Sequence, residues 1–543
     1  MAAPAPVAEV RVQVDGIKAI RLEWDPAAGA DAQFLEIEES TGDGGPTALP
    51  PIEFGAVVAS HRVDVFLPLG HSTRYRIRSC NPAGCSESPW AVTPDLDSAM
   101  GYVKAVQPLS EDWFGHAVAL SGDGSRLAVA SWVEDGTVGG IDPVQVPSAG
   151  FDAGAVEVYR RDGARWQREA VIKPPTPGWG DRFGTDLAWS DDGQVLIMGV
   201  PNEDGTGSGV GSDPSIKGAW DSGAAHVYER DSDGQWRHAA YLKADVATAY
   251  RQFGQHVAMS GDGLWAAVTE RGSSAMRVHL FRRTGSGWEA TSPLSPLGNR
   301  IDDVVGRRIS LDRTGRTLAV GVSSDTEGGA GVDPAPGGEV TGSGSVYVFE
   351  RNTVDAWTLS ARIRADVLHA NMRFGWATAL SADGRRLVVG ASPLGPSVFE
   401  GGAYVFERLD TGWVAGASLQ PGVRSGARGF GFAVGMSHDG RTVAVSDIDE
   451  GGPGLGFDFT AGAGTGGGSV TVFVQGSGSG WQALPPVHAP NDQPGLLFGW
   501  SLSLAGDGKS LAVGATGDRS GAPGIGGDNQ DQTAPRSGAV HLY

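Results

Sequence analysis

Short runs in which apolar and polar residues alternate dominate the first hundred residues. Proline and glycine separate these runs, which lie at residues 10–14, 19–24, 34–38, 63–67 and 75–79. Alternation with period two places one face of each strand in a core and the other face in solvent. The pattern predicts an antiparallel β-sandwich over residues 1–98, with Trp24 and Tyr75 as large core residues.

A longer pattern repeats from residue 114 to the end of the chain. Each copy opens with Phe-Gly, or Val-Gly in one case, and the copies begin at Phe114, Phe183, Phe253, Val305, Phe374, Phe430 and Phe498. An apolar run, a turn of the type Ser-x-Asp-Gly and further apolar runs follow. The spacing of 52 residues (253 to 305) to 70 residues (183 to 253) and the four short strands per copy predict the blades of a β-propeller.

The first three strands occur in seven copies, but only six copies have a fourth strand. These fourth strands begin with Trp166, Trp236, Trp288, Trp357, Trp413 and Trp481, and the chain stops before a seventh. A matching stretch at 101–106 precedes the first copy. We therefore expect this stretch to complete the last blade, which closes a seven-bladed ring over residues 99–543 and leaves no exposed edge.

Composition and charge restrict the class of protein. With 40% hydrophobic residues and 16 Trp, the chain can build a large core. The formal net charge of −21 disfavours nucleic acid and anionic lipid as partners. No run approaches the roughly 18 apolar residues of a membrane span. We expect the protein to be a monomer. The first residues lack the features of a signal peptide, so the chain is either cytosolic or the mature form of an exported protein.

The two cysteines bear on that choice. Cys80 and Cys85 are the only cysteines, and they stand five apart in Cys-Asn-Pro-Ala-Gly-Cys. A tight turn there brings the sulfurs together, whereas two free thiols would indicate a reducing cytosol. Two cysteines and scattered histidines are too few for a zinc site. We expect a disulfide and export, to the cell surface, the periplasm or the medium.

Both halves of the chain resemble known repeat families. The stretch Leu22-Glu23-Trp24-Asp25-Pro26 and the later strand that begins at Tyr75 resemble a fibronectin type III domain. The Phe-Gly pairs, together with stretches such as Val388-Val389-Gly390-Ala391-Ser392, resemble FG-GAP repeats. These repeats build integrin α-subunit propellers and many bacterial extracellular proteins, so the resemblance implies an extracellular propeller.

The resemblance does not carry a calcium site into the Ser-x-Asp-Gly turns. Blades of the family often hold calcium in a loop with several Asp and Asn residues, but each turn here offers a single carboxylate. Calcium prefers six to eight oxygen ligands. The turn residues Asp123, Asp192, Asp262, Asp383, Asp439 and Asp507 are therefore interpreted as turn formers.

The connections between the second and third strands differ greatly in length. They are long in five copies, at 132–152, 201–221, 323–342, 447–468 and 516–537, and short in the third and fifth. Long insertions on one face indicate a binding surface, although solvated Gly-rich loops are the alternative. No cofactor is certain, and the candidate ligands for calcium in these loops are Asp135, Asp204, Asp325, Asp449 and Asp528.

Aromatic and cationic residues precede or follow the Phe-Gly pairs, near the expected mouth of the central channel. They are Trp113, Trp179, Tyr250, Trp376 and Trp500, with Arg182, Arg251, Arg373 and Arg428. Aromatic faces stack on sugar rings, and arginine binds carboxylate or sulfate groups. Packing between blades is the alternative role for the aromatic residues.

The sequence contains no recognisable catalytic motif, and the catalytic residues of any activity are unknown. The chain is interpreted as an all-β, exported, bacterial-type adhesion or binding protein whose loop-rich propeller face binds a glycan or a protein. One alternative is a polysaccharide lyase or hydrolase with its site at the channel mouth. Another is a structural component of the cell surface.

Overall fold

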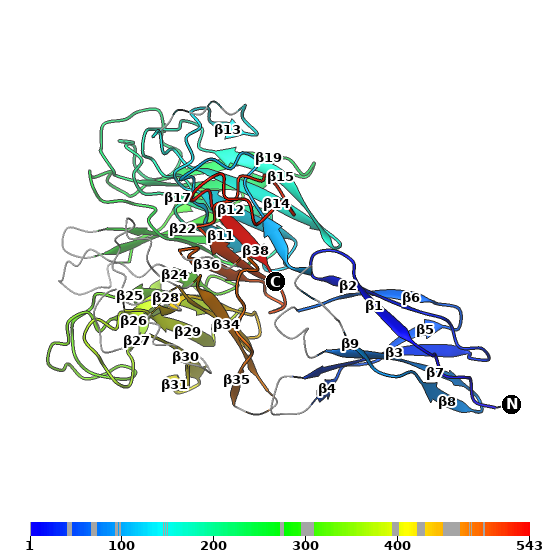
Figure 1. Cartoon of the computed structure of the whole chain (residues 1–543). Coiled ribbons are helices and arrows are strands. Elements are labelled where there is room, and N and C mark those ends of the chain that lie inside the picture. The colour runs from blue at the N-terminus through cyan, green and yellow to red at the C-terminus, as the bar shows by residue number, and fades with distance from the viewer. Residues whose placement is uncertain are drawn as a thin grey trace.

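The computed structural model describes residues 2–40, 46–66, 73–92, 96, 99–144, 146, 148, 150–271, 276–294, 309–393, 401–420, 429–448, 467–476, 478, 480–491 and 495–543. These residues form strands joined by turns and loops, with no α-helix among them. No helix of the described part is therefore long and apolar enough to cross a membrane. Figure 1 shows a group of N-terminal sheets beside a larger circular array of sheets.

The N-terminal strands form two sheets that share one core. One sheet has the order β1-β2-β6, and the other joins β4, β3, β7 and β8, with β5 on β3 and β9 on β7. Trp24 and Tyr75 are both buried in this core, as their place in the alternating runs predicts. The strands are β1 (Val10–Val14), β2 (Ala19–Trp24), β3 (Ala32–Ser40), β4 (Pro46–Ala48), β5 (Ile52–Gly55), β6 (Ser60–Asp64), β7 (Arg74–Asn81), β8 (Gly84–Glu87) and β9 (Ala91–Val92).

Two details of this sandwich concern particular predictions. Cys80 and Cys85 stand opposite each other in the pairing of β7 with β8, and they form a disulfide. The strand expected at 63–67 lies earlier, at Ser60–Asp64, because its residues pair with β2 from Ser60 onward. Position 67 is outside the described residues.

The remaining strands form antiparallel sheets that succeed one another along the chain. Each sheet is named here by its innermost strand. The first four contain β11 (Phe114–Leu120), β12 (Arg126–Ser131), β14 (Ala155–Asp162), β15 (Arg165–Lys173) and the short β13 (Gly140–Ile141); β16 (Leu187–Trp189), β17 (Val195–Val200), β18 (Ala224–Arg230) and β19 (Trp236–Leu242); β20 (Val257–Met259), β21 (Trp265–Glu270), β22 (Arg277–Thr284) and β23 (Gly287–Ala290); and β24 (Ile309–Leu311), β25 (Thr317–Val322), β26 (Ser345–Arg351) and β27 (Trp357–Ile363).

The last sheets have the same design, and the final one takes its outer strand from far upstream. Their strands are β28 (Phe374–Leu380), β29 (Arg386–Ala391), β30 (Gly402–Leu409) and β31 (Gly412–Leu419); β32 (Phe430–Met436), β33 (Thr442–Asp447), β34 (Ser469–Gln475) and β35 (Trp481–Ala483); and β36 (Phe498–Leu504), β37 (Leu511–Ala515), β38 (Ala539–Leu542) and β10 (Gly101–Val103). Tyr102 pairs with His541 in this sheet, so the expected pairing of the N-terminal strand with the last strand is confirmed.

The innermost strands of these sheets form a closed circle. Each one contacts the innermost strand of the next sheet, and β36 contacts β11. Backbone hydrogen bonds of 2.8–3.1 Å also join each first turn to the next, from Asp123 to Asp191, Asp191 to Gly261, Asp262 to Arg313, Arg313 to Ala382, Ala382 to His438, His438 to Gly506 and Gly506 to Gly122. The array therefore has no free edge sheet, which protects it from pairing with other chains.

The Phe-Gly pairs lock neighbouring sheets together. The Phe253 N–H donates to the Ser222 carbonyl of the preceding sheet at 3.0 Å, and the Phe253 ring is fully buried. Gly254 has a φ of 93°, and a Cβ atom there would lie 2.0 Å from the Ala224 carbonyl oxygen. Only glycine allows this conformation and this close an approach, which explains why the motif repeats.

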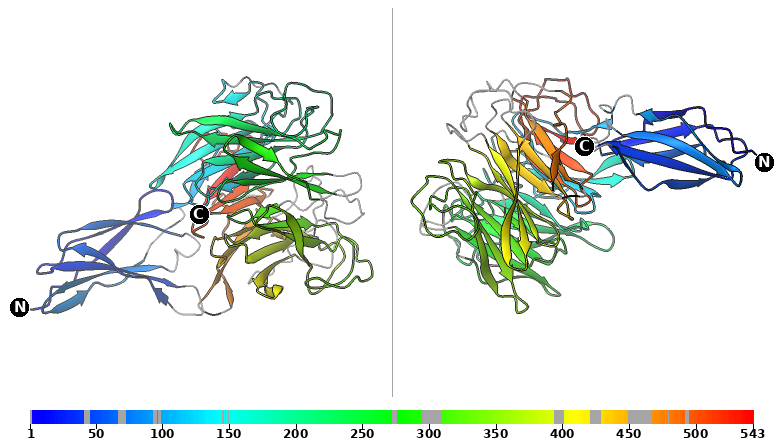
Figure 2. Two further views of the ribbon diagram at one scale, coloured as in Figure 1. Left: turned by 180° about the vertical axis from the view of Figure 1, so that it is seen from behind. Right: turned by 90° about the horizontal axis from the view of Figure 1, so that it is seen from below.

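The N-terminal sandwich rests on one end of the circular array. We call the end with the first-to-second and third-to-fourth strand turns the turn face, and the opposite end the loop face. Lys18 donates from Nζ to Ser510 Oγ at 2.7 Å, and Arg161 pairs with Asp64 at 2.9 Å. Ser510 and Arg161 lie at the turn face. Figure 2 shows the N-terminal sheets on one side and the long loops on the other, so the loop face is left open.

We predict that Lys18 makes stability depend on pH. Burial, helped by the nearby Arg161 charge, lowers the pKa of Lys18 to about 7, from an ordinary value of 10.5. The unfolded chain keeps this proton up to about pH 10, so folding releases it between these values and the stabilisation grows as pH rises. The melting temperature of the native protein, relative to that of Lys18→Met, should increase between about pH 6 and about pH 9. A difference that is constant with pH would contradict this prediction.

Candidate binding surface

Long loops of the loop face begin with a carboxylate that pairs with a buried cation. In four sheets the acid stands three residues after the second strand, and the cation ends or directly follows the fourth strand. The cations are at most 1% exposed. The pairs are Glu134 with Lys173, Glu203 with Lys243 (3.0 Å), Asp325 with Arg364 (2.8 Å) and Asp518 with Lys104 (2.9 Å).

The three lysines among these cations also reach the far ends of the loops that they hold. Lys173 Nζ donates to the Gly154 carbonyl at 3.0 Å, and Lys243 Nζ donates to Ser222 Oγ at 2.8 Å. Lys104 Nζ donates to Ser537 Oγ at 2.7 Å. Each ammonium group therefore joins the beginning of a loop, the end of that loop and the outer strand of its sheet.

A second anchor repeats in the same four loops. An aliphatic residue seven positions after the acid folds back and pairs with the residue that precedes the cation. The pairs are Ile141 with Ile172, Val210 with Leu242, Val332 with Ile363 and Ile525 with Val103. From composition alone, these loops could equally well be solvated and irregular. The structure fixes them to the outer strands at two points.

Electrostatics keep the carboxylates of two of these pairs ionised at neutral pH, whereas burial lowers the pKa values of the cations Lys104, Lys173 and Lys243. Burial alone would raise the pKa of Asp325, but the Ser345 hydroxyl, the Glu327 N–H and the Arg364 and Arg362 guanidinium groups outweigh it and lower the pKa to about 2. For Asp518, burial is likewise outweighed, chiefly by the Lys104 charge, so its pKa is also lowered. A charged pair with further hydrogen bonds is the arrangement that makes buried charge tolerable.

Sheets with short connections lack the anchor. Thr291 follows the fourth strand of the β20 sheet, and Gln420 follows that of the β28 sheet, so neither has a cation at this place. Most of the long loop of the β32 sheet lies outside the described residues. There, His488 Nδ1 lies 3.3 Å from the Gly468 carbonyl, the position equivalent to Gly154. Among the described connections, the buried cation at the end of the fourth strand therefore accompanies the long loops and not the short ones.

The acidic residues predicted as calcium ligands lie apart, each in its own loop. Asp135 accepts the Asp152 N–H at 3.1 Å, and Asp204 accepts the Asp221 N–H at 2.8 Å. Asp528 accepts the Gln530 N–H, whereas Asp325 pairs with two arginines. Asp449 lies outside the described residues. No group of three or more His, Cys, Asp or Glu side chains suited to a metal ion occurs in the described part.

We predict that Lys104→Met destabilises the protein by about 3–5 kcal/mol, because it leaves the carboxylate of Asp518 buried without its cation. Lys509→Met, a change of the same kind at an exposed lysine, should shift stability by less than about 0.5 kcal/mol. Chemical denaturation measures both. Adding Asp518→Leu to Lys104→Met should recover part of the loss, and equal losses in the two single variants would contradict the role of the pair.

At the channel mouth, several predicted residues meet in one aromatic arc. Starting from the β16 sheet, the Arg182 guanidinium lies 4.6 Å from the Trp132 ring, which stacks on His116 at 4.0 Å. Trp500 Nε1 donates to His116 Nδ1 at 3.3 Å. The arc continues through Phe432, 5.4 Å from Trp500 and 5.8 Å from Trp376, to Arg373, 5.6 Å from Trp376. Trp113 packs edge-on against Trp500.

The arc corrects the sugar-stacking role expected for two of its members. Trp376 is 2% exposed and Trp500 is 5% exposed, so their faces are covered by neighbouring rings. Four members of the arc directly follow a Phe-Gly pair and pack between neighbouring inner strands, namely His116, Trp376, Phe432 and Trp500. Three members of the arc were not predicted from the sequence, namely His116, Trp132 and Phe432. Alignment of the repeats at their Phe-Gly pairs reveals His116 and Phe432, but not Trp132.

Exposed aromatic residues lie instead in the loops that enter, cross and leave the β16 sheet. Trp179 is 75% exposed and Tyr250 is 66% exposed, as a binding role for them requires. Trp220, in the long loop 201–221, is 64% exposed and was missed by sequence reasoning. The Tyr250 N–H donates to the Trp220 carbonyl at 2.7 Å. We call these three residues, with exposed Ile216 and Val246, the aromatic loop patch.

Arg251 lies beside the aromatic loop patch. The Arg251 carbonyl accepts the Arg271 N–H at 2.7 Å.

The opposite end of the propeller axis is built differently. At the turn face, Asp191 pairs with Arg313 at 2.9 Å and with His438 at 3.2 Å. These side chains come from three different sheets and line the cavity at that end of the axis. The turn face of the axis is thus occupied by the ion pair between Asp191 and Arg313, with the His438 ring beside Asp191.

Two buried carboxyl groups of the loop face have strongly raised pKa values. Burial raises the pKa of Asp112 to about 8 and that of Asp181 to about 7. Each accepts a backbone N–H three residues earlier in its own loop, from Leu109 and Gly178. Among the described residues, neither carboxyl lies within hydrogen-bond distance of a second titratable side chain. They therefore hold local turns.

The comparisons with known proteins support the fold. An FG-GAP repeat model matches residues 357–406, which run from β27 into β30. The chain contains an FG-GAP repeat. Together with the closed circle of four-stranded sheets, this repeat identifies the fold as a β-propeller. The match covers the outer strand of one sheet and the first three strands of the next.

Solved propellers resemble the chain only remotely. The Dos1 propeller has a TM-score of 0.39 at 11% identity and covers 82% of this chain and 94% of that chain. TolB from Acinetobacter baumannii has a TM-score of 0.34 at 12% identity and covers 68% of this chain and 65% of that chain. No curated protein matches the sequence. Similarity at this level carries no argument about ligand or activity.

We predict that Trp500→Ala destabilises the propeller by about 3–5 kcal/mol, because it leaves a large cavity in the aromatic arc. Trp179→Ala removes the same side chain from an exposed site and should change stability by less than about 0.5 kcal/mol. Thermal denaturation of both variants checks this contrast. If Trp500→Ala has the same melting temperature as the native protein, the Trp500 ring is not part of the packing between sheets.

Proposed function

We propose that this chain is a non-enzymatic, exported binding protein that uses the loop face of its propeller to hold a glycan or a protein. In this proposal the sheets of residues 99–543 are seven blades, and residues 1–98 form a fibronectin type III-like module. FG-GAP repeats are typical of extracellular and periplasmic proteins, and the disulfide between Cys80 and Cys85 agrees with export. The protein acts as a monomer.

The observation that carries the proposal is the aromatic loop patch on a firmly held loop. Loop 201–221 presents Trp220 and Ile216 to solvent, while Glu203 and Val210 of the same loop are fixed to the outer strand. Exposed aromatic rings on a rigid support bind at a small entropic cost, because little has to be ordered on association. Tryptophan and tyrosine are enriched at binding interfaces, because each ring offers a large apolar surface together with one polar group.

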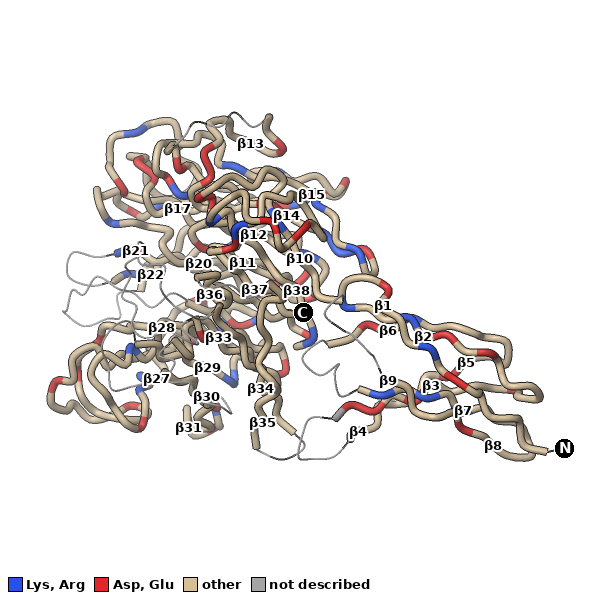
Figure 3. The backbone as a smooth tube through the Cα atoms, viewed as in Figure 1, with Lys and Arg blue, Asp and Glu red and all other residues tan. Residues whose placement is uncertain are grey.

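The position of the N-terminal module supports the same function. It contacts the turn face through Lys18 and Arg161, so it does not cover the loops. Figure 3 shows that charged residues lie mainly in loops and outer strands, with largely uncharged inner strands around the axis. The module is therefore placed to act as a spacer that presents the loop face to a partner.

We predict that single Ala substitutions of Trp179, Trp220 and Tyr250 weaken binding of a hit from a glycan array or a surface-protein screen by about 2- to 13-fold, the range of one stacked aromatic contact. Melting temperatures should stay unchanged, because all three side chains are exposed. Val354→Ala is the matched control, since Val354 is 79% exposed in the β26–β27 turn at the opposite face.

Two outcomes would reject this proposal. The first is binding that is equally strong in the three aromatic variants and in Val354→Ala, which would place the site elsewhere. The second is release of product from a bound polysaccharide, which would make the chain an enzyme.

A further inference from the structure

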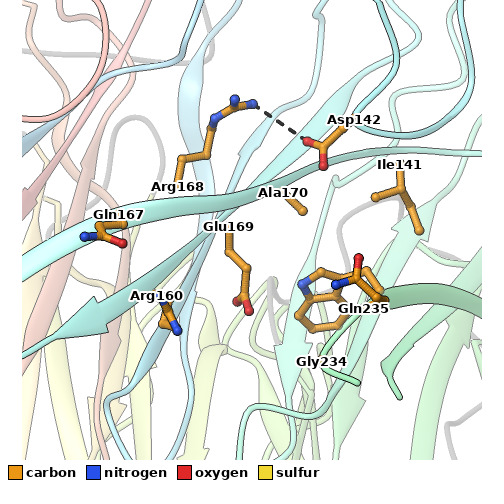
Figure 4. Close-up of a pocket in the computed structure, with 10 residues that line it drawn as sticks. Ile141, Asp142, Arg160, Gln167, Arg168, Glu169, Ala170, Gly234 and Gln235 are labelled. Carbon is orange, nitrogen blue, oxygen red and sulfur yellow. Dashed lines mark ion pairs between the residues drawn. The ribbon is translucent and has the colours of Figure 1, made fainter. Parts of the chain in front are cut away.

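A cavity of about 340 Å³ opens on the side wall of the propeller, between the outer strands of the β11 and β16 sheets. Figure 4 shows its lining, in which residues of β14 and β15 face the turn between β18 and β19. Residues 141 and 142, at the end of the short strand β13, form one rim. Among the described sheets of the propeller, only the β11 sheet has such a fifth strand.

The acidic groups of this cavity are neutralised by arginines. The Glu169 carboxylate accepts from Arg126 Nε at 3.0 Å and pairs with Arg230 Nη2 at 2.8 Å. Asp142 pairs with Arg168 at 3.8 Å, the contact drawn in Figure 4. The guanidinium of Arg160 also lines the cavity. The lining itself carries two arginines and two carboxylates, and Arg126 and Arg230, which pair with Glu169, add two further positive charges within a protein whose net charge is −21.

Several hydrogen-bond donors around the cavity have no acceptor among the described residues. Trp236 is 8% exposed and lines the cavity, and its buried Nε1–H has no partner. The equivalent indole of the next sheet, Trp288, donates to Glu229 at 3.2 Å, whereas the equivalent indoles of Trp357 and Trp413 also have no partner among the described residues. The side chains of Arg160 and Gln235 are exposed to solvent and make no hydrogen bond within the described part. A buried donor without an acceptor costs stability, and at Trp236 such a donor belongs to the lining of a cavity that can admit a ligand that accepts.

We propose that this cavity binds an oxyanion, the carboxylate or sulfate group of an acidic saccharide. Arg160 provides a planar fork of N–H donors that matches such a group. The Trp236 indole and the Gln235 amide supply neutral donors, and the paired Glu169 adds little repulsion. The cavity lies on the side wall, apart from the aromatic loop patch, so this site is independent of the function proposed for the loop face.

The test is calorimetric titration of the full chain with sodium sulfate, with an oligogalacturonate, with a sulfated oligosaccharide and with a neutral maltooligosaccharide. We expect binding of the anionic ligands and none of the neutral one. Arg160→Gln should weaken binding at least about tenfold, the loss typical of one charge-assisted hydrogen-bond pair. Trp236→Phe keeps the ring, removes the N–H and should weaken binding about threefold or more.

Matched controls make the result specific. Arg385→Gln changes the charge equally at an exposed arginine of the β28 sheet. Trp413→Phe removes another buried indole N–H that has no partner, at the equivalent strand position. Both controls should leave affinity unchanged. Because Arg160 is exposed, its variant should fold, and an unchanged melting temperature verifies this.

The pattern of results decides between the sources of the anion and can reject the site. Preference for oligogalacturonate indicates a carboxylate ligand, and preference for the sulfated oligosaccharide indicates sulfate. Absence of binding by the native protein would overturn the proposal. So would equal losses in Arg160→Gln and Arg385→Gln, because the effect would then be one of overall charge.

Discussion

The buried pair between a loop carboxylate and a cation of the outer strand is the interaction on which the loop face depends. Two charges removed from water are tolerated only when they meet each other and further hydrogen-bond partners. Lys104 and Asp518 satisfy this condition, with both side chains fully buried. The pair fixes the start of a long insertion relative to the sheet below it. Where the connection is short, in the β20 and β28 sheets, the described residues contain no such pair.

The circle of sheets and the anchored loops depend on each other. Lys104 follows β10, the strand that completes the last sheet, so the residue that closes the circle also holds the loop that begins at Asp518. The carbonyl of Gly538, at the end of that loop, accepts from Lys104, and Gly538 also pairs with Phe114 of the next sheet. The ammonium group of Lys104 therefore contributes to three things: closure of the circle, attachment of the loop and contact with the neighbouring sheet.

Much of the fold was predictable from the sequence because it depends on local pattern. Alternation of apolar residues and the Phe-Gly repeat locate the strands, and the missing last strand indicates the pairing of Tyr102 with His541. The loop anchors were not found, because their partners are distant in sequence: Lys104 and Asp518 are 414 positions apart. Their signal is an acid followed seven residues later by Ile or Val, which appears only when the loops are aligned with one another.

The candidate site was predictable in composition but not in geometry. Trp179 and Trp376 look alike in sequence, since each stands close to a Phe-Gly pair. The first is exposed in a loop, and the second follows the pair and is enclosed by the converging inner strands. How near those strands come depends on the curvature of the whole circle, which no local pattern specifies. For the same reason, the side-wall cavity arises only when two outer strands, whose residues are some 70 positions apart, are placed side by side.

The central claim is that the long loops are held in one conformation by the sheet beneath them. Hydrogen–deuterium exchange of the native protein tests it most directly at the amides of Gly209 and Gly211, which donate to Ala244 and Tyr241 of the outer strand. The account predicts that these amides exchange as slowly as those of β19, because they open only when the sheet does. Exchange at the rate of an unstructured peptide would contradict it.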